Sequence, residues 1–168
     1  MAEEIINRVA ASTLEEINLE EYFPGEEIVT FDLKPFLFME LILKEKDFRE
    51  ALLKVDWSIY EGKIVAVNCS TDAIIPMWAY MLVAAYLQPV AKDVIFGSEE
   101  DALKQVFLRN IAALDLSKYE DKRIVIKGCG SLPVKEYAYL EITKRLRAIA
   151  KSIMYGEACS TVPVFKRK

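Results

Sequence analysis

The sequence predicts an α/β fold: a single three-layer domain over residues 1–168, with a mostly parallel sheet flanked by helices. From Phe31 onward, short apolar runs without polar alternation are separated by amphipathic stretches of about 12 to 17 residues, which is typical of strands buried on both faces. The chain has 168 residues, of which 53% are apolar, and is therefore long enough to bury one core. No linker, low-complexity tract or structural repeat is expected to divide it.

The N-terminal quarter predicts an arm, a strand and a helix. Residues 1–25 are expected to form an N-terminal helical arm, because Ser12 or Thr13 followed three residues later by an acid is a helix-capping pattern. Residues 27–33 read as a strand. Helical spacing of apolar residues then predicts a helix over 39–55, with paired acids and lysines on its solvated face.

The rest of the chain alternates between the two element types. Strands are predicted at 63–68, 93–97, 123–127 and 152–156. Helices are expected at 76–87, 98–114 and 133–149. The uncharged stretch 73–91 contains a helix too short to cross a bilayer, because Pro76 and Pro89 bracket it, so we interpret it as a buried core helix.

Composition and charge exclude several function classes. The chain contains no histidine, which removes every His-containing metal site and every Ser-His or Cys-His catalytic pair. The formal net charge of −4 opposes binding to nucleic acid, and no membrane partner is expected. Acidic Glu3 and Glu4 stand where a secretory signal would carry basic residues, which favours a cytoplasmic location. In that compartment the three cysteines are expected as thiols or metal ligands.

Each cysteine follows a predicted strand. Cys69 comes after 63–68, Cys129 after 123–127, and Cys159 shortly after 152–156. Because parallel strands end at one edge of a sheet, the three thiols could converge on one thiophilic metal, either Zn²⁺ or an iron–sulfur centre. A site that uses two of the three, or three structural cysteines, stays open.

Residues beside the cysteines extend this metal hypothesis. Ser70 and Thr71 repeat as Ser-Thr after Cys159, and Gly128 and Gly130 would let backbone amides approach a bound group. We therefore predict Ser70, Thr71, Gly128 and Gly130 as cofactor-binding residues.

Two acidic residues close to the cysteines in the sequence are candidate oxygen ligands. Asp72 is the first candidate for a fourth metal ligand and Glu157 the second. The alternative for Asp72 is that it caps the following helix. That helix would also offer its positive end to Cys69, which suits a nucleophile as well as a ligand.

Four stretches resemble the uncharacterised bacterial family known as domain of unknown function 2480. They are residues 36–48, 68–76, 125–129 and 150–163, and the likeness covers nearly the whole chain. The resemblance implies a cytoplasmic protein without established activity, and it associates the chain with iron–sulfur assembly proteins as partners.

Two functional classes follow from these observations. The first is a thiolate metal or iron–sulfur binding accessory protein, linked to cluster assembly. The second is a thiol-dependent enzyme on a small anionic substrate, although only Asp72, Glu157, Lys127 or Lys151 could act as its base. A scaffold with inert cysteines is the third reading, and self-association into a homo-oligomer stays open.

Overall fold

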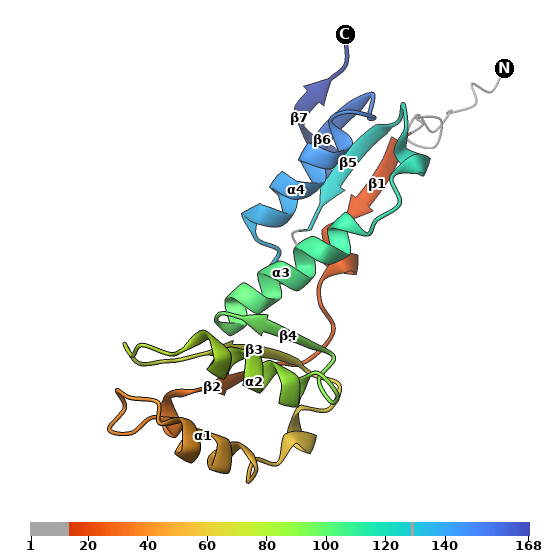
Figure 1. The fold of residues 1–168 in the computed structure, drawn as a ribbon. Coiled ribbons are helices and arrows are strands. Elements are labelled where there is room, and N and C mark those ends of the chain that lie inside the picture. Colours follow the sequence, from red (N-terminus) through yellow and green to blue (C-terminus); the bar gives the residue numbers. More distant parts are fainter. Residues whose placement is uncertain (1–13, 129) are drawn as a thin grey trace, which may run out of the picture. The chain divides into compact units, whose positions relative to one another are not determined.

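The strands of the computed structural model, which describes residues 14–128 and 130–168, form two sheets (Figure 1). One sheet has the order β1-β5-β6-β7 and the other the order β2-β3-β4. All neighbours pair in parallel except β6 and β7. The α/β class and the mostly parallel pairing are confirmed, while the strands divide between two sheets where the sequence predicted one.

The described chain forms two compact units, one on each sheet. Unit 2 is the continuous segment Gly25–Gln105. Unit 1 combines the described residues up to Pro24 with Val106–Lys168. The chain therefore begins unit 1, builds the whole of unit 2, and then returns to complete unit 1.

Unit 2 places two helices on its three-stranded sheet. Its elements are β2 (Ile28–Asp32), 3-10 helix η2 (Lys34–Phe36), α1 (Glu45–Leu52), 3-10 helix η3 (Trp57–Tyr60), β3 (Ile64–Asn68), α2 (Met77–Leu87) and β4 (Asp93–Phe96), and α3 (Glu99–Ala112) begins in it. Phe48 and Leu52 of α1 and Val83 of α2 are fully buried in one cluster with Val65 of β3. Burying such side chains contributes about 1.5 to 3 kcal/mol each, which is why the apolar stripes face the sheet.

Unit 1 repeats this plan and adds a strand. Its elements are β1 (Leu14–Asn18), 3-10 helix η1 (Leu19–Tyr22), the second half of α3, 3-10 helix η4 (Ser117–Tyr119), β5 (Arg123–Lys127), α4 (Glu136–Leu146), β6 (Ser152–Glu157) and β7 (Ser160–Lys166). Phe107 and Ile111 of α3, Ile142 of α4 and Ile124 of β5 are fully buried together.

The two units contain an internal repeat. Residues 48–97 of the first copy match residues 107–156 of the second at a constant offset of 59 residues, so that Phe48 corresponds to Phe107 and Gly97 to Gly156. β3 corresponds to β5 and α2 to α4, residue for residue. Gly97 follows strand positions 93–96, and Gly156 follows the matching positions 152–155. Both glycines have positive φ, 129° and 116°. The expectation that no structural repeat exists is thereby corrected.

The hydrogen bonds of the connections repeat as well. The amide of Gly62 donates to the carbonyl of Val90 at 3.0 Å, and the amide of Asp121, its counterpart, donates to that of Ile149 at 2.9 Å. Gly62 and Asp121 both have positive φ, 70° and 58°. Few of the paired residues are identical, so the repeat is plain in backbone geometry and faint in sequence.

Two expected elements differ from the observed ones, and one observed strand was not expected. The described part of the N-terminal arm, 14–25, is strand β1 and a 3-10 turn, because it pairs with β5 and buries Ile17 and Leu19; residues 1–13 lie outside the described chain. The helix predicted over 39–55 spans only Glu45–Leu52, since Met39 and Glu40 have positive φ. Strand β7, Ser160–Lys166, has no counterpart among the predicted elements.

None of the helices in the described ranges has the length and apolar character needed to cross a membrane.

Candidate functional site

The carboxyl edge of the unit 2 sheet is organised by Asp32. This carboxylate, at the end of β2, accepts hydrogen bonds from the amide of Ser70 at 2.9 Å and from the amide of Lys34 at 2.9 Å. The Ser70 hydroxyl also donates to it. Burial acts to raise the pKa of Asp32, but the bonds from Ser70 and Lys34 outweigh it, so the pKa lies below its usual value. Asp32 is therefore an ionised acceptor that fixes the chain after β3.

Cys69 lies beside this corner and packs against the apolar core of unit 2. It is half-buried and in contact with the cluster that contains Val67 and Ala79. Tyr80 of α2 is its neighbour: burial raises the pKa of Tyr80, and the nearby thiol raises it further. These surroundings are those of a small apolar side chain.

The loop after Cys69 differs from the expected helix start. α2 begins only at Met77, with Pro76 at its N-cap and no side-chain cap. The alternative in which Asp72 caps this helix is therefore wrong, because residues 70–76 form a loop that contains a turn from the amide of Ala73 to the carbonyl of Thr71.

The carboxyl edge of the unit 1 sheet carries the two predicted glycines. A Cβ on Gly128 would lie 2.7 Å from the hydroxyl of Tyr139, and a Cβ on Gly130 would collide with the Glu20 carboxylate. Glu20 also accepts a hydrogen bond from the amide of Leu132 at 2.8 Å. Close packing against Tyr139 and Glu20 therefore explains the glycines without any ligand.

Cys159 occupies the turn between β6 and β7 and is exposed. Its neighbour Glu157 lies 3.8 Å from the ammonium of Lys127, at the end of β5. Lys127 is also ion-paired with Glu16 at 2.5 Å, and that hydrogen bond raises the pKa of the lysine. Two carboxylates, those of Glu16 and Glu157, thus share one cation at this edge, and Cys159 is in the turn that follows Glu157.

The structure distributes the predicted metal ligands between the two units. Cys69 and Asp72 belong to unit 2, Cys159 to unit 1, and Cys129 lies outside the described residues. Within the described ranges no group of three or more Cys, Asp or Glu side chains is arranged to hold a metal ion. Convergence of all three cysteines stays a prediction.

Sequence reasoning missed two residues at these edges, Asp32 and Glu20. Both act across the sheet or across a loop, on residues far away in the chain. One signal could have found Asp32: Asn18-Leu19 and Asp32-Leu33 end β1 and β2 in the same way. Each polar side chain accepts a bond from the amide two residues later, and each leucine is fully buried.

Comparisons with known proteins give one match. A family model described as "Protein of unknown function (DUF2480)" matches residues 3–167. No curated protein and no solved structure matches the chain.

Proposed function

The chain belongs to the DUF2480 family, and we propose that it is an accessory protein that binds a thiophilic metal ion through cysteine thiolates. The minimal ligand set is Cys129 and Cys159, with Glu157 as the oxygen ligand. One observation carries the proposal. β5 and β6 are neighbours, with Ile126 opposite Tyr155, so the chain leaves both strands at the same edge of the unit 1 sheet.

Chain geometry supports a shared site at this edge. Cys129 follows Gly128 directly, and Cys159 is in the turn that ends β6. Neighbouring strands are about 4.8 Å apart, and two thiolates on one metal ion need sulfurs only about 4 Å apart. Cys69 is outside this minimal set because it packs against the core of the other unit.

The charges at this edge suit a cation. Glu157 and Glu16 are both ion-paired with Lys127, so a bound cation would compete with the lysine for their oxygens. With no histidine in the chain, thiolate and carboxylate are the strong ligands available to it.

Two thiolates and one carboxylate leave a coordination position open on Zn²⁺. An iron–sulfur cluster normally takes four cysteine ligands, so a cluster would need further ligands from a partner protein. An incomplete ligand set is what a protein that passes on its cargo requires. Iron–sulfur assembly proteins therefore remain the proposed partners.

The thiol-dependent enzyme has less support. Cys69 is half-buried and is not at the start of a helix. An enzyme also needs a base within hydrogen-bond reach of the thiol, and the carboxylate that organises this corner, Asp32, is engaged with Ser70.

The test is metal binding by the full chain, purified without oxygen, by elemental analysis and visible spectroscopy. Co²⁺ then serves as a probe, because thiolate ligation gives it an intense charge-transfer band. Cys129→Ser and Cys159→Ser are each expected to weaken binding at least about tenfold. Cys69→Ser is the matched control and should bind normally.

Three outcomes separate the readings. Loss of binding in all three variants would support the metal function with a three-thiolate site. Normal binding in both Cys129→Ser and Cys159→Ser would refute the proposal. Absence of Zn²⁺, iron and Co²⁺ binding by the unaltered chain would also refute it and favour a scaffold with inert cysteines.

A further inference from the structure

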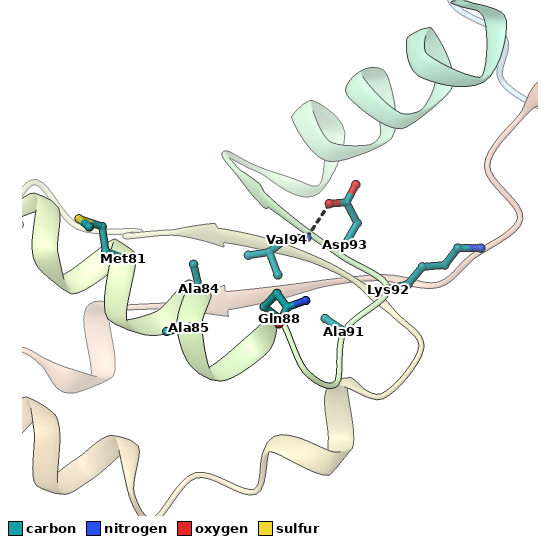
Figure 2. Close-up of a pocket in the computed structure, with 8 residues that line it drawn as sticks. All are labelled: Met81, Ala84, Ala85, Gln88, Ala91, Lys92, Asp93 and Val94. Carbon is teal, nitrogen blue, oxygen red and sulfur yellow. Dashed lines mark hydrogen bonds between the residues drawn. The ribbon is translucent and has the colours of Figure 1, made fainter. Parts of the chain in front are cut away.

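A cleft of about 730 Å³ lies between the second half of α2 and the start of β4. β4 is the edge strand of its sheet and pairs only with β3 among the described residues. Figure 2 shows Ala84 on α2, Gln88 at the C-terminal end of that helix and Val94 on β4 around the cleft. Its lining is Met81, Ala84, Ala85, Gln88, Ala91, Lys92, Asp93 and Val94.

In unit 1 the corresponding place is filled by strand β7. Phe165 of β7 lies opposite Ile153, the counterpart of Val94. The guanidinium of Arg147, the counterpart of Gln88, lies 3.8 Å over the Phe165 ring. β7 therefore shows how an added strand with an aromatic side chain occupies this position in the repeated fold.

Among its described residues, unit 2 has no strand at the place that β7 occupies in unit 1. After β4 the described chain passes directly into α3. The exposed edge of β4 and the cleft beside it are thus a position for an additional strand. Unit 1 fills that position with β7, and unit 2 leaves it empty.

The outward side of α2 also indicates that something covers it. Met81 is 70% exposed, and alanines occupy positions 84 and 85. In α4 the corresponding residues are Thr143 and Lys144, as expected for a solvated helix face. A helix that is apolar all round is normally a buried one.

The geometry points to a second copy of this chain as the occupant, paired antiparallel through β4. Residues two apart in a strand share a face, so Phe96 is on the side of Val94. The centroid of the Phe96 ring is 5.4 Å from that of Tyr80 of α2, so Phe96 is on the face of the sheet that α2 covers. Phe96 is nevertheless 70% exposed. β4 therefore carries an exposed aromatic side chain on the same face of the sheet as the cleft.

One register satisfies both copies. When Ile95 lies opposite Ile95 of the second copy, Phe96 of the second copy lies opposite Val94. That is the relation of Phe165 to Ile153 in unit 1. A two-fold axis at Ile95 fills both clefts at once, and the two sheets join into one.

Charges do not oppose this register. Asp93 lies opposite Gly97 of the second copy, so the two aspartates do not face each other. Lys92 is ion-paired with Glu26 within unit 2. The alanines of α2 leave room for the incoming phenylalanine ring beside Gln88.

The experiment is sedimentation equilibrium of the full chain over a wide concentration range. The unaltered protein should form a dimer. Phe96→Asp and Met81→Glu should each raise its dissociation constant at least about tenfold, because each places a charge in the dry cleft. Both side chains are largely exposed, so at concentrations where all three proteins are monomeric the thermal unfolding of the two variants should match that of the unaltered chain.

Two matched controls locate the interface. Leu140→Glu changes the counterpart of Met81 in α4, which is 72% exposed, and Leu53→Asp changes an apolar residue of unit 2 outside the cleft, which is 73% exposed. Both should leave the dimer intact. Hydrogen exchange should show β4 amides that become protected only at dimer concentrations.

A monomer at every concentration would overturn the inference. So would a dimer that survives both Phe96→Asp and Met81→Glu, or one that Leu53→Asp disrupts equally. Because no proposed metal ligand lines the cleft, the metal proposal stands or falls separately.

Discussion

The Asp32 carboxylate, at the end of β2, accepts hydrogen bonds from both the amide and the hydroxyl of Ser70, just after β3. Asp32 thereby ties two neighbouring strands together at their carboxyl ends, and it holds the loop that follows Cys69. This relation gives a stability prediction and a pH prediction.

Asp32→Ala should lower the free energy of unfolding by about 1 to 2 kcal/mol, because three hydrogen bonds to a partly buried carboxylate are lost. Ser70→Ala should cost less, and the double variant should cost less than the sum of the two. Urea unfolding of the four proteins measures the coupling. Additive effects would show that the Asp32–Ser70 bond contributes nothing.

The lowered pKa of Asp32 predicts a loss of stability in acid. The folded state favours the ionised carboxylate, so its contribution is complete above the ordinary pKa of about 3.9 and is lost as the pH falls through the lower folded value. Asp32→Asn should therefore flatten the decline of unfolding free energy between about pH 5 and pH 2. An unchanged acid profile in this variant would contradict the assignment.

Gly128→Ala should destabilise unit 1 by about 1 to 3 kcal/mol, because the added Cβ would lie 2.7 Å from the Tyr139 hydroxyl. Tyr139→Phe in the same chain should restore part of the loss by removing that oxygen. Gly25→Ala is the control, since nothing lies within 4 Å of its Cβ position. Thermal unfolding compares them, and equal effects at both glycines would refute the packing explanation.

Phe48→Ala and Phe107→Ala should each cost about 3 to 5 kcal/mol, since both rings are fully buried at corresponding positions. Because the two phenylalanines belong to separate cores, hydrogen exchange should be faster in β3 for the first variant and in β5 for the second. Equal acceleration in both strands for either variant would mean that the units unfold together.

Iodoacetamide should label Cys159 well before Cys69, because Cys159 is exposed in a turn and Cys69 is half-buried against the core. Under the metal proposal, added Zn²⁺ should slow the labelling of Cys159 and leave Cys69 unchanged. Mass spectrometry of peptides follows each site. Faster labelling of Cys69 would contradict the description of its surroundings.

Much of the fold could be predicted from the sequence, because β3, β5 and β6 are continuous apolar runs and α2 and α4 follow clear helix patterns. β1 could not, since Leu14 and Ile17 stand three apart with two glutamates between them, which is also a helical spacing. When β1 is read as a helix, the unit 1 sheet loses its first strand. The remaining predicted strands are then too few to suggest two separate sheets, and the sequence predicts one.

The candidate site was less predictable. That the three cysteines follow strands can be read along the chain, but which strands are neighbours depends on pairing between distant segments. Asp32 lies 38 residues from Ser70. That a strand could occupy the cleft beside β4 follows only from comparison with β7, which the sequence does not identify as a strand because Pro163 and the basic residues after Phe165 interrupt the pattern.

The insertion of unit 2 between β1 and β5 also sets an order for folding during synthesis. All of unit 2, Gly25–Gln105, can leave the ribosome and close its core while β5 is still unmade. β1 is synthesised first, yet its only strand partner in the described structure, β5, begins at Arg123. The first strand made must therefore wait unpaired until the inserted unit has been completed, and unit 1 carries the slow, long-range step of folding.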